Sequence, residues 1–363
     1  MKTPSLILAA GVVAAVTLSA CGGTDDGEGS AAVDTGASDP ASEAAEEPAL
    51  EVAAGFYPLE FLVREVGGDR VETVGLTPPG AEAHDLELTA DSLVTLTDAD
   101  LLVYLETFQP AVDDAAANRE GTSLDLGALA TREYEEAEGE AHSDEAHSDD
   151  EAHSDDEAHS DEAHSDEAHS DEEAHSDEEA HSDEEAHEHG ATDPHFWTDP
   201  LVMAEAAATV RDALSEADPD GAADYAANTE ALVGELEALD AAAQEALAAC
   251  EVTTLVTAHD AFGYFADRYG FESAPISGLS PEDEPSPAEL ATITDLVSER
   301  GISTVYTETL IPTDLADTVA AETGAATAVL DPVEGITDDS PGDDYLSIMQ
   351  ANIDAVADGQ RCG

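Results

Sequence analysis

Histidine and acidic residues alternate in a long repeat near the middle of the chain, and both residue types can bind divalent metal ions. The repeat cycles through Ala-His-Ser-Asp-Glu with a period of five or six residues. Imidazole suits zinc, copper and nickel, and histidine-rich tracts are typical of metal binding. Ten of the 13 histidines lie in it: His142, His147, His153, His159, His164, His169, His175, His181, His187 and His189. We expect weak metal binding there, without a defined geometry.

The composition of the repeat leaves two other interpretations open. Residues 133–190 contain almost no large apolar side chains, so we expect a solvated, disordered loop. Such a loop could act only as a solubility spacer, or as a pH sensor, because histidine titrates near neutral pH. Histidines spaced by five or six residues do not share one helical face. Metal capture is the interpretation that we favour.

Only three histidines lie outside the repeat, and each follows a predicted strand or lies in a loop. They are His84, His195 and His259. Ligands of parallel α/β sheets bind beyond the carboxyl ends of the strands, so we expect these side chains to share one site. Three imidazoles and one oxygen ligand make a tetrahedral zinc site.

Strands and helices alternate on both sides of the repeat, which predicts an α/β fold with parallel sheets. We expect strands at residues 50–56, 71–76, 101–105, 123–126, 254–258, 273–276, 304–307 and 326–330. We expect helices at residues 58–66, 89–98, 108–118, 201–214, 262–269, 287–300, 312–323 and 344–357. Residues 219–249 predict one continuous helix of about 30 residues, or about 45 Å. The predicted organisation is an N-terminal lobe (49–217), a connecting helix (218–250) and a C-terminal lobe (251–363).

The N-terminus predicts export. Lys2 precedes an apolar run that is too short to span a bilayer. Leu-Ser-Ala-Cys at residues 18–21 resembles a bacterial lipobox, which implies a signal peptide over residues 1–20 and lipidation of Cys21. The alternative is an ordinary signal peptide with a chance cysteine. Residues 21–48 read as a flexible acidic tether. We expect an extracytoplasmic protein that is held at the outer face of the bacterial cytoplasmic membrane by its lipid alone.

The net charge and the two remaining cysteines limit the possible ligands and the compartment of the protein. A net charge of -77 excludes nucleic acid, because phosphate binding needs a basic surface. Cys250 and Cys362 predict a disulfide in an oxidising compartment, and two cysteines are too few for a cysteine-based zinc cluster. The disulfide would tie the end of the connecting helix to the C-terminus.

Four stretches resemble the metal-binding components of zinc and manganese ABC importers, the cluster 9 solute-binding proteins, and most closely their ZnuA-type zinc members. They are residues 80–87 (GAEAHDLE), 193–197 (DPHFW), 258–265 (AHDAFGYF) and 278–286 (GLSPEDEPS). The resemblance runs from about Leu50 to the end, apart from the repeat. It implies two α/β lobes joined by a rigid helix, with a His-rich acidic insertion between the first two ligands.

The resemblance also implies the ligands, at His84, His195 and His259, with a carboxylate from the C-terminal lobe. Asp338 matches that position best, with Asp339 or a water molecule as alternatives. Manganese members usually carry glutamate where this chain has His259, and imidazole favours zinc.

Other family positions match or differ without changing the chemistry. Ala83 stands where the family usually has proline. Glu87, Glu308 and Trp197 match recurring positions, which we interpret as lobe packing or hydrogen bonds to the ligating histidines.

The function implied by the resemblance is capture of Zn(II) outside the cytoplasm and its delivery to the transmembrane subunits of an ABC permease. Zinc would be transported cargo, and a monomer without organic cofactor or enzymatic activity would carry it. The alternatives are a manganese importer component, a zinc hydrolase, and a surface metal buffer or adhesin. A hydrolase needs an open zinc position and a placed general base, and no His-Glu-x-x-His motif is present.

Deleting residues 139–190 should leave one tightly bound zinc ion and reduce only the number of weakly bound ions. Metal analysis after equilibrium dialysis, with the full chain as control, measures both numbers. Loss of all metal binding would favour the buffer interpretation and reject a site at the three isolated histidines.

Overall fold

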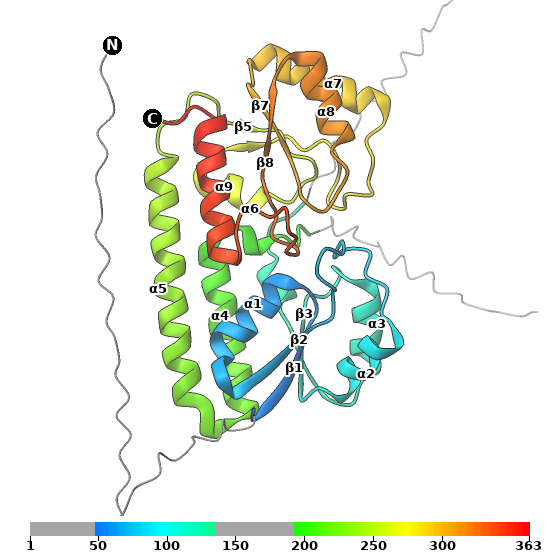
Figure 1. The fold of residues 1–363 in the computed structure, drawn as a ribbon, viewed down its shortest axis with the longest axis vertical. Helices are drawn as coiled ribbons and strands as arrows, with labels where there is room; N and C mark the ends of the chain where they lie inside the picture. Colours follow the sequence, from blue (N-terminus) through cyan, green and yellow to red (C-terminus); the bar gives the residue numbers. More distant parts are fainter. Residues whose placement is uncertain (1–47, 135–191) are drawn as a thin grey trace, which may run out of the picture. The chain divides into compact units, whose positions relative to one another are not determined.

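The computed structural model describes residues 48–134 and 192–363, which lie in one compact unit. As predicted, it contains two α/β lobes (Figure 1). The first lobe has one parallel sheet, with the strand order β2-β1-β3-β4. Its strands are β1 (Leu50–Ala54), β2 (Val71–Gly75), β3 (Leu101–Tyr104) and β4 (Thr122–Asp125). Its helices are α1 (Tyr57–Gly67), α2 (Ala90–Asp98), α3 (Pro110–Asn118) and α4 (Pro200–Ala217).

Alternate residues of the central strands face two different cores, because side chains along a strand point to opposite faces. Val52 and Val103 lie in the main core with residues of α1 and α4. Ala53 and Leu102 lie in a smaller core with residues of α2 and α3. The sheet is therefore covered on both faces, which leaves the carboxyl ends of its strands as the place for a ligand.

The second lobe repeats this arrangement with shorter strands. Parallel pairs form between β5 (Thr254–Leu255) and β6 (Glu272–Ser273), and between β7 (Thr304–Thr307) and β8 (Ala326–Val329). The backbone N–H of Tyr306 donates to Val256 O at 2.8 Å and joins the two pairs. The resulting order, β6-β5-β7-β8, is that of the first lobe.

Helix ends in the second lobe follow their capping residues. Its helices are α6 (Gly263–Tyr269), α7 (Pro287–Arg300), α8 (Asp314–Thr323) and α9 (Tyr345–Gly359). The N-cap Ser286 and Glu289 form a capping box at the start of α7, and Gly301 ends the helix in the left-handed conformation. The predicted bounds of this helix are confirmed at both ends.

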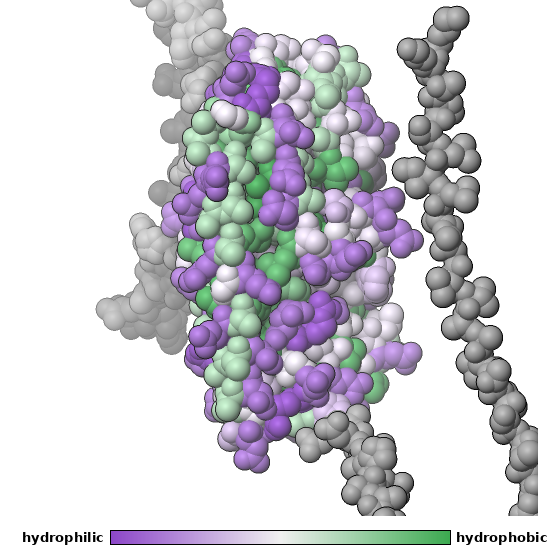
Figure 2. All heavy atoms as spheres, turned by 60° about the vertical axis from the view of Figure 1, so that its left-hand side comes forward, coloured by the Kyte–Doolittle hydropathy of each residue, from purple (hydrophilic) through white to green (hydrophobic). Residues whose placement is uncertain are grey.

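The connecting helix α5 (Ala222–Ala246) is shorter than predicted, because a 3-10 turn precedes it and irregular turns follow it. It packs along α4 and contacts α1 of the first lobe and α9 of the second. Its buried residues include Tyr225, Leu232 and Leu239, and the main core runs through both lobes. Figure 2 brings the α5 side of the molecule forward and shows hydrophilic side chains between the apolar ones. The main hydrophobic core is thus shared by both lobes.

Several predictions concern residues that the structure does not describe. The signal peptide, Cys21, most of the tether and the histidine repeat lie outside the described residues. At the border of the repeat, Glu133 and Thr192 form an isolated antiparallel bridge, so Glu133 belongs to the folded part. No helix within residues 48–134 and 192–363 is long and apolar enough to cross a membrane.

The predicted disulfide is confirmed. Cys250 follows α5 and is bonded to Cys362 after α9, across 112 residues of sequence. The same two residues also form an isolated antiparallel bridge between their backbone segments.

Replacing Cys250 and Cys362 by serine should lower the free energy of unfolding by about 2–5 kcal/mol, because the crosslink restricts a long loop in the unfolded chain. Urea unfolding measures the loss. The Cys250→Ser single variant should lose as much as the double variant, and an unchanged unfolding midpoint in both would contradict the structural role of the bond.

Candidate metal centre

Four side chains meet at the carboxyl ends of the strands. His84 follows β2, His259 follows β5, and Glu334 follows β8. His195 begins the 3-10 turn Phe196–Thr198 that leads into α4. Each offers one ligand atom, and these atoms all lie within 4.8 Å of one another. The three histidines outside the repeat are therefore brought together, although 111 residues separate the first two.

The spacing of the ligand atoms fits a tetrahedral ion. Glu334 Oε1 lies 3.2 Å from His259 Nε2, 3.3 Å from His195 Nε2 and 3.6 Å from His84 Nε2. The Nε2 atoms of His84 and His195 are 3.4 Å apart. A tetrahedron with metal–ligand bonds of about 2.0–2.1 Å has edges of about 3.3–3.4 Å. The four groups could therefore hold one zinc ion with small adjustments.

A buried carboxylate orients the ring of His195. Asp193 Oδ1 lies 2.8 Å from His195 Nδ1 and accepts the backbone N–H of His195 at 2.9 Å. Arg132 Nη1 donates to Asp193 Oδ2 at 2.9 Å. A ring held through Nδ1 presents Nε2 to the metal position.

Glu308 does the same for His259, which is fully buried. Its Oε2 lies 2.8 Å from His259 Nδ1, and its Oε1 accepts the backbone N–H of His259 at 3.1 Å. Of the two expected roles of Glu308, packing between the lobes or hydrogen bonding to a histidine of the site, the structure shows the hydrogen bond, which Glu308 accepts from His259. Glu87, by contrast, is exposed.

His84 is the most accessible member of the group, with 11% of its side chain exposed. Its ring packs against Phe108 at a centroid distance of 4.4 Å, and Glu82 Oε1 accepts its backbone N–H. The other three side chains are at most 2% exposed, so the site is open mainly at His84.

Opposing effects set the charges of the buried groups. Burial favours neutral His195, but hydrogen bonds to Asp193 and Glu334 outweigh it and raise its pKa. Burial likewise opposes the charge on His259, while Glu308 and Glu334 raise its pKa well above the usual value. Burial alone would raise the pKa of Glu334, but the three histidines hold it well below the usual value. Protons and a metal ion would therefore compete for the same imidazoles.

The fourth side chain of the group is Glu334, and the predicted Asp338 is not part of it. Both Asp338 and Asp339 are exposed. Glu334 is buried and directly follows Val333, whose φ of 63° is in the left-handed region. The position directly after β8 could have indicated Glu334, because His84 and His259 also follow strands.

Comparison with known families agrees with this geometry. The family model ZnuA, described as "Zinc-uptake complex component A periplasmic", matches residues 52–359. The chain belongs to the ZnuA family. Membership confirms the predicted resemblance to this family and, with the two α/β lobes described above, the predicted fold class.

Relatives of this ZnuA-family chain are similar over most of its length. Zinc-binding lipoprotein AdcA of Streptococcus pneumoniae is 29% identical over 317 residues, or 85% of this chain and 55% of that protein. The chain thus spans about half the length of that curated relative. The high-affinity zinc uptake system protein ZnuA of Bacillus subtilis is 29% identical over 315 residues, or 85% of this chain and 87% of that protein.

A solved structure shares the fold. The Zn(II)-bound ZnuA-like domain of Streptococcus pneumoniae AdcA superimposes with a TM-score of 0.61 and 27% identity. The match covers 86% of this chain and 98% of that domain.

Zinc affinity should fall as the pH falls, because zinc must displace protons from His195 and His259. The raised pKa values of both place the onset of this loss above the ordinary histidine pKa of about 6.5. The slope should be about tenfold in affinity per pH unit for each proton released. Chelator competition between about pH 5 and pH 8 measures it.

The control for this pH dependence is Glu308→Gln, which removes one carboxylate that raises the pKa of His259. The onset in this variant should move to lower pH. Zinc affinity that is independent of pH in the unaltered chain would contradict the assignment of imidazole ligands.

Proposed function

We propose that this protein captures Zn(II) outside the cytoplasm and delivers it to the transmembrane subunits of an ABC permease. The observation that carries the proposal is the buried cluster of three imidazoles and one carboxylate with tetrahedral spacing. Membership of a zinc-uptake family and the names of the zinc-binding relatives support the same cargo.

The donor set favours zinc over manganese. Manganese prefers more oxygen ligands, whereas imidazole suits zinc. The charge also balances, because Glu334 together with Glu308 offsets a divalent cation while Asp193 is paired with Arg132. These features support Zn(II) as the ion that the site retains.

Transport explains the site better than hydrolysis does. A catalytic zinc keeps one position open for water, whereas Glu334 faces all three imidazoles and would fill that position. We therefore propose that the protein is not an enzyme. A surface buffer based on the repeat alone would not need this separate buried site.

Delivery requires the ion to leave between the two lobes. The shared hydrophobic core opposes a large rotation of one lobe against the other, so we propose that movement of the loop after β8 opens the site. A lipid on Cys21 would hold a monomer next to the permease.

His195→Ala should abolish tight zinc binding, because it removes a ligand and leaves Asp193 buried without its imidazole partner. Competition with a high-affinity chelator measures the dissociation constant. Nanomolar affinity in this variant would reject the site.

A matched pair of variants tests the fourth ligand. Glu334→Ala should weaken zinc binding by at least about tenfold, the range known for partners of metal ligands. Asp338→Ala removes the same charge from an exposed position of the same loop and should change the affinity by less than about twofold. The reverse order of effects would restore Asp338 as the ligand.

A further inference from the structure

The backbone that carries Glu334 has an unusual conformation. Val333 has a φ of 63°, and a β-branched residue with positive φ is a genuine outlier. Such conformations persist only where surrounding contacts determine them, and they cluster at ligand sites. The contacts that hold this segment therefore bear on how Glu334 reaches the metal position.

One set of contacts comes from the second lobe itself. Asp331, which is fully buried, accepts the backbone N–H of Val333 through Oδ1 at 2.8 Å. Its Oδ2 accepts the hydroxyl groups of Thr309 at 3.1 Å and Ser340 at 2.9 Å. Asn352 of α9 bonds to both the backbone N–H and the carbonyl of Asp331. These bonds fix the residue two positions before Val333.

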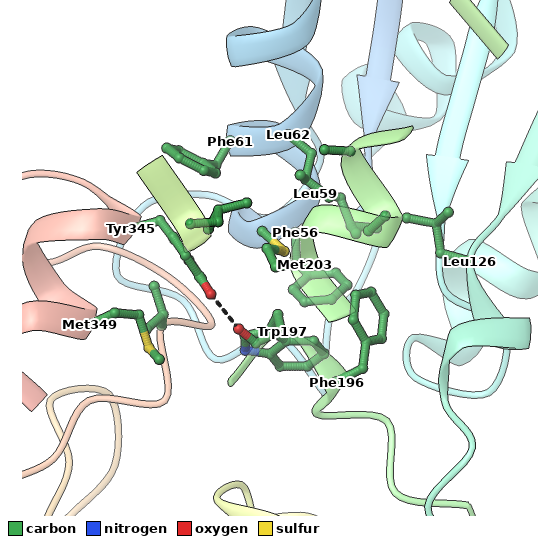
Figure 3. Packing of buried hydrophobic residues seen from close by; sticks show 14 of the residues in the cluster. Phe56, Leu59, Phe61, Leu62, Leu126, Phe196, Trp197, Met203, Tyr345 and Met349 are labelled. Carbon is green, nitrogen blue, oxygen red and sulfur yellow. Dashed lines mark hydrogen bonds between the residues drawn. The ribbon is translucent and has the colours of Figure 1, made fainter. Parts of the chain in front are cut away.

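The remaining contact comes from the segment that carries His195. The indole Nε1–H of Trp197 donates to Pro332 O at 2.8 Å, between two buried groups. The Trp197 ring also lies against the His195 ring, at a centroid distance of 5.1 Å. Figure 3 shows Trp197 among Phe56 and Phe196, with its own carbonyl bonded to the Tyr345 hydroxyl. Trp197 therefore links the backbone next to Val333 to a rigid aromatic cluster.

We propose that Trp197 is a positioning residue, whose indole N–H holds the Pro332–Val333 backbone so that Glu334 reaches the three imidazoles. The inference rests on the proposed function, since it concerns how the zinc site is completed. Without the Trp197 bond, the Val333 backbone relaxes toward negative φ and Glu334 turns out of the cluster. The segment that carries His195 then no longer fixes the position of the segment that carries Glu334.

A double-mutant cycle on zinc affinity tests this role. Trp197→Phe keeps an aromatic ring and the backbone carbonyl but removes the N–H. It should weaken zinc binding by about tenfold to a hundredfold. In the Glu334→Ala background the same change should have less than about a twofold effect, because the residue through which Trp197 acts is already gone.

Tyr225→Phe is the matched control, since it removes a hydrogen bond from a buried ring of the main core to Asp218 Oδ2 without touching Trp197 or its partners. It should lower the melting temperature of the metal-free protein and leave zinc affinity within about twofold. If Trp197 had only a structural role, Trp197→Phe would likewise lower the melting temperature and leave zinc affinity unchanged.

The outcomes distinguish failure of the positioning role of Trp197 from failure of the proposed zinc-binding function. Additive effects of Trp197→Phe and Glu334→Ala would overturn the positioning role while leaving the zinc site intact. Absence of tight zinc binding in the unaltered chain would instead reject the proposed function. If Trp197→Phe does not fold, benzothienylalanine at position 197, which keeps the fused ring and removes only the N–H that bonds to Pro332 O, enters the same cycle with the same two readings.

Discussion

The arrangement of the site depends on one constraint: the imidazole rings must point Nε2 at a common position while the buried rings keep a hydrogen-bond partner at Nδ1. Each ring must present Nε2 to one shared point, and the buried rings must also pair Nδ1, because an unpaired buried polar group is costly. Asp193 and Glu308 meet this need for His195 and His259. Asp193 in turn needs Arg132, whose Nε also bonds to Asp267 of α6. A network of hydrogen bonds therefore runs from the imidazoles through Asp193 and Arg132 to helix α6.

The two lobes serve this requirement through their topology. The first sheet runs β2-β1-β3-β4, and the strand pairs of the second lobe follow the same order. Parallel strands of both lobes end at the site, so short loops after β2, β5 and β8 supply His84, His259 and Glu334. The continuous core around α4, α5 and α9 holds these ends in register. Small loop movements then cost less than separation of the lobes.

The sequence predicted that His84, His195 and His259 come together, because histidines are scarce outside the repeat and scarcity made their positions informative. Glu334 could not be chosen in the same way, because the chain has 86 acidic residues and one more carries no contrast. It directly follows Val333, whose positive φ is accompanied by tertiary contacts from Asp331 and Trp197 that the sequence does not reveal. The helix predicted at residues 287–300 matches α7, which the structure shows to be capped by Ser286 and ended by Gly301. The strands at 254–258 and 273–276 proved shorter, because strand length depends on a partner that is distant in sequence.

The bridge between Glu133 and Thr192 has a bearing on how this chain can change over generations. It brings the two borders of the repeat side by side at a fixed place in the fold. The composition of the repeat predicts a disordered loop, and for such a loop between fixed ends, doubling the length costs only about 0.6 kcal/mol in closure entropy. Slippage during replication of a five- or six-residue repeat would thus add or remove units at almost no cost to folding. Repeat number can drift while the protein beside it stays the same.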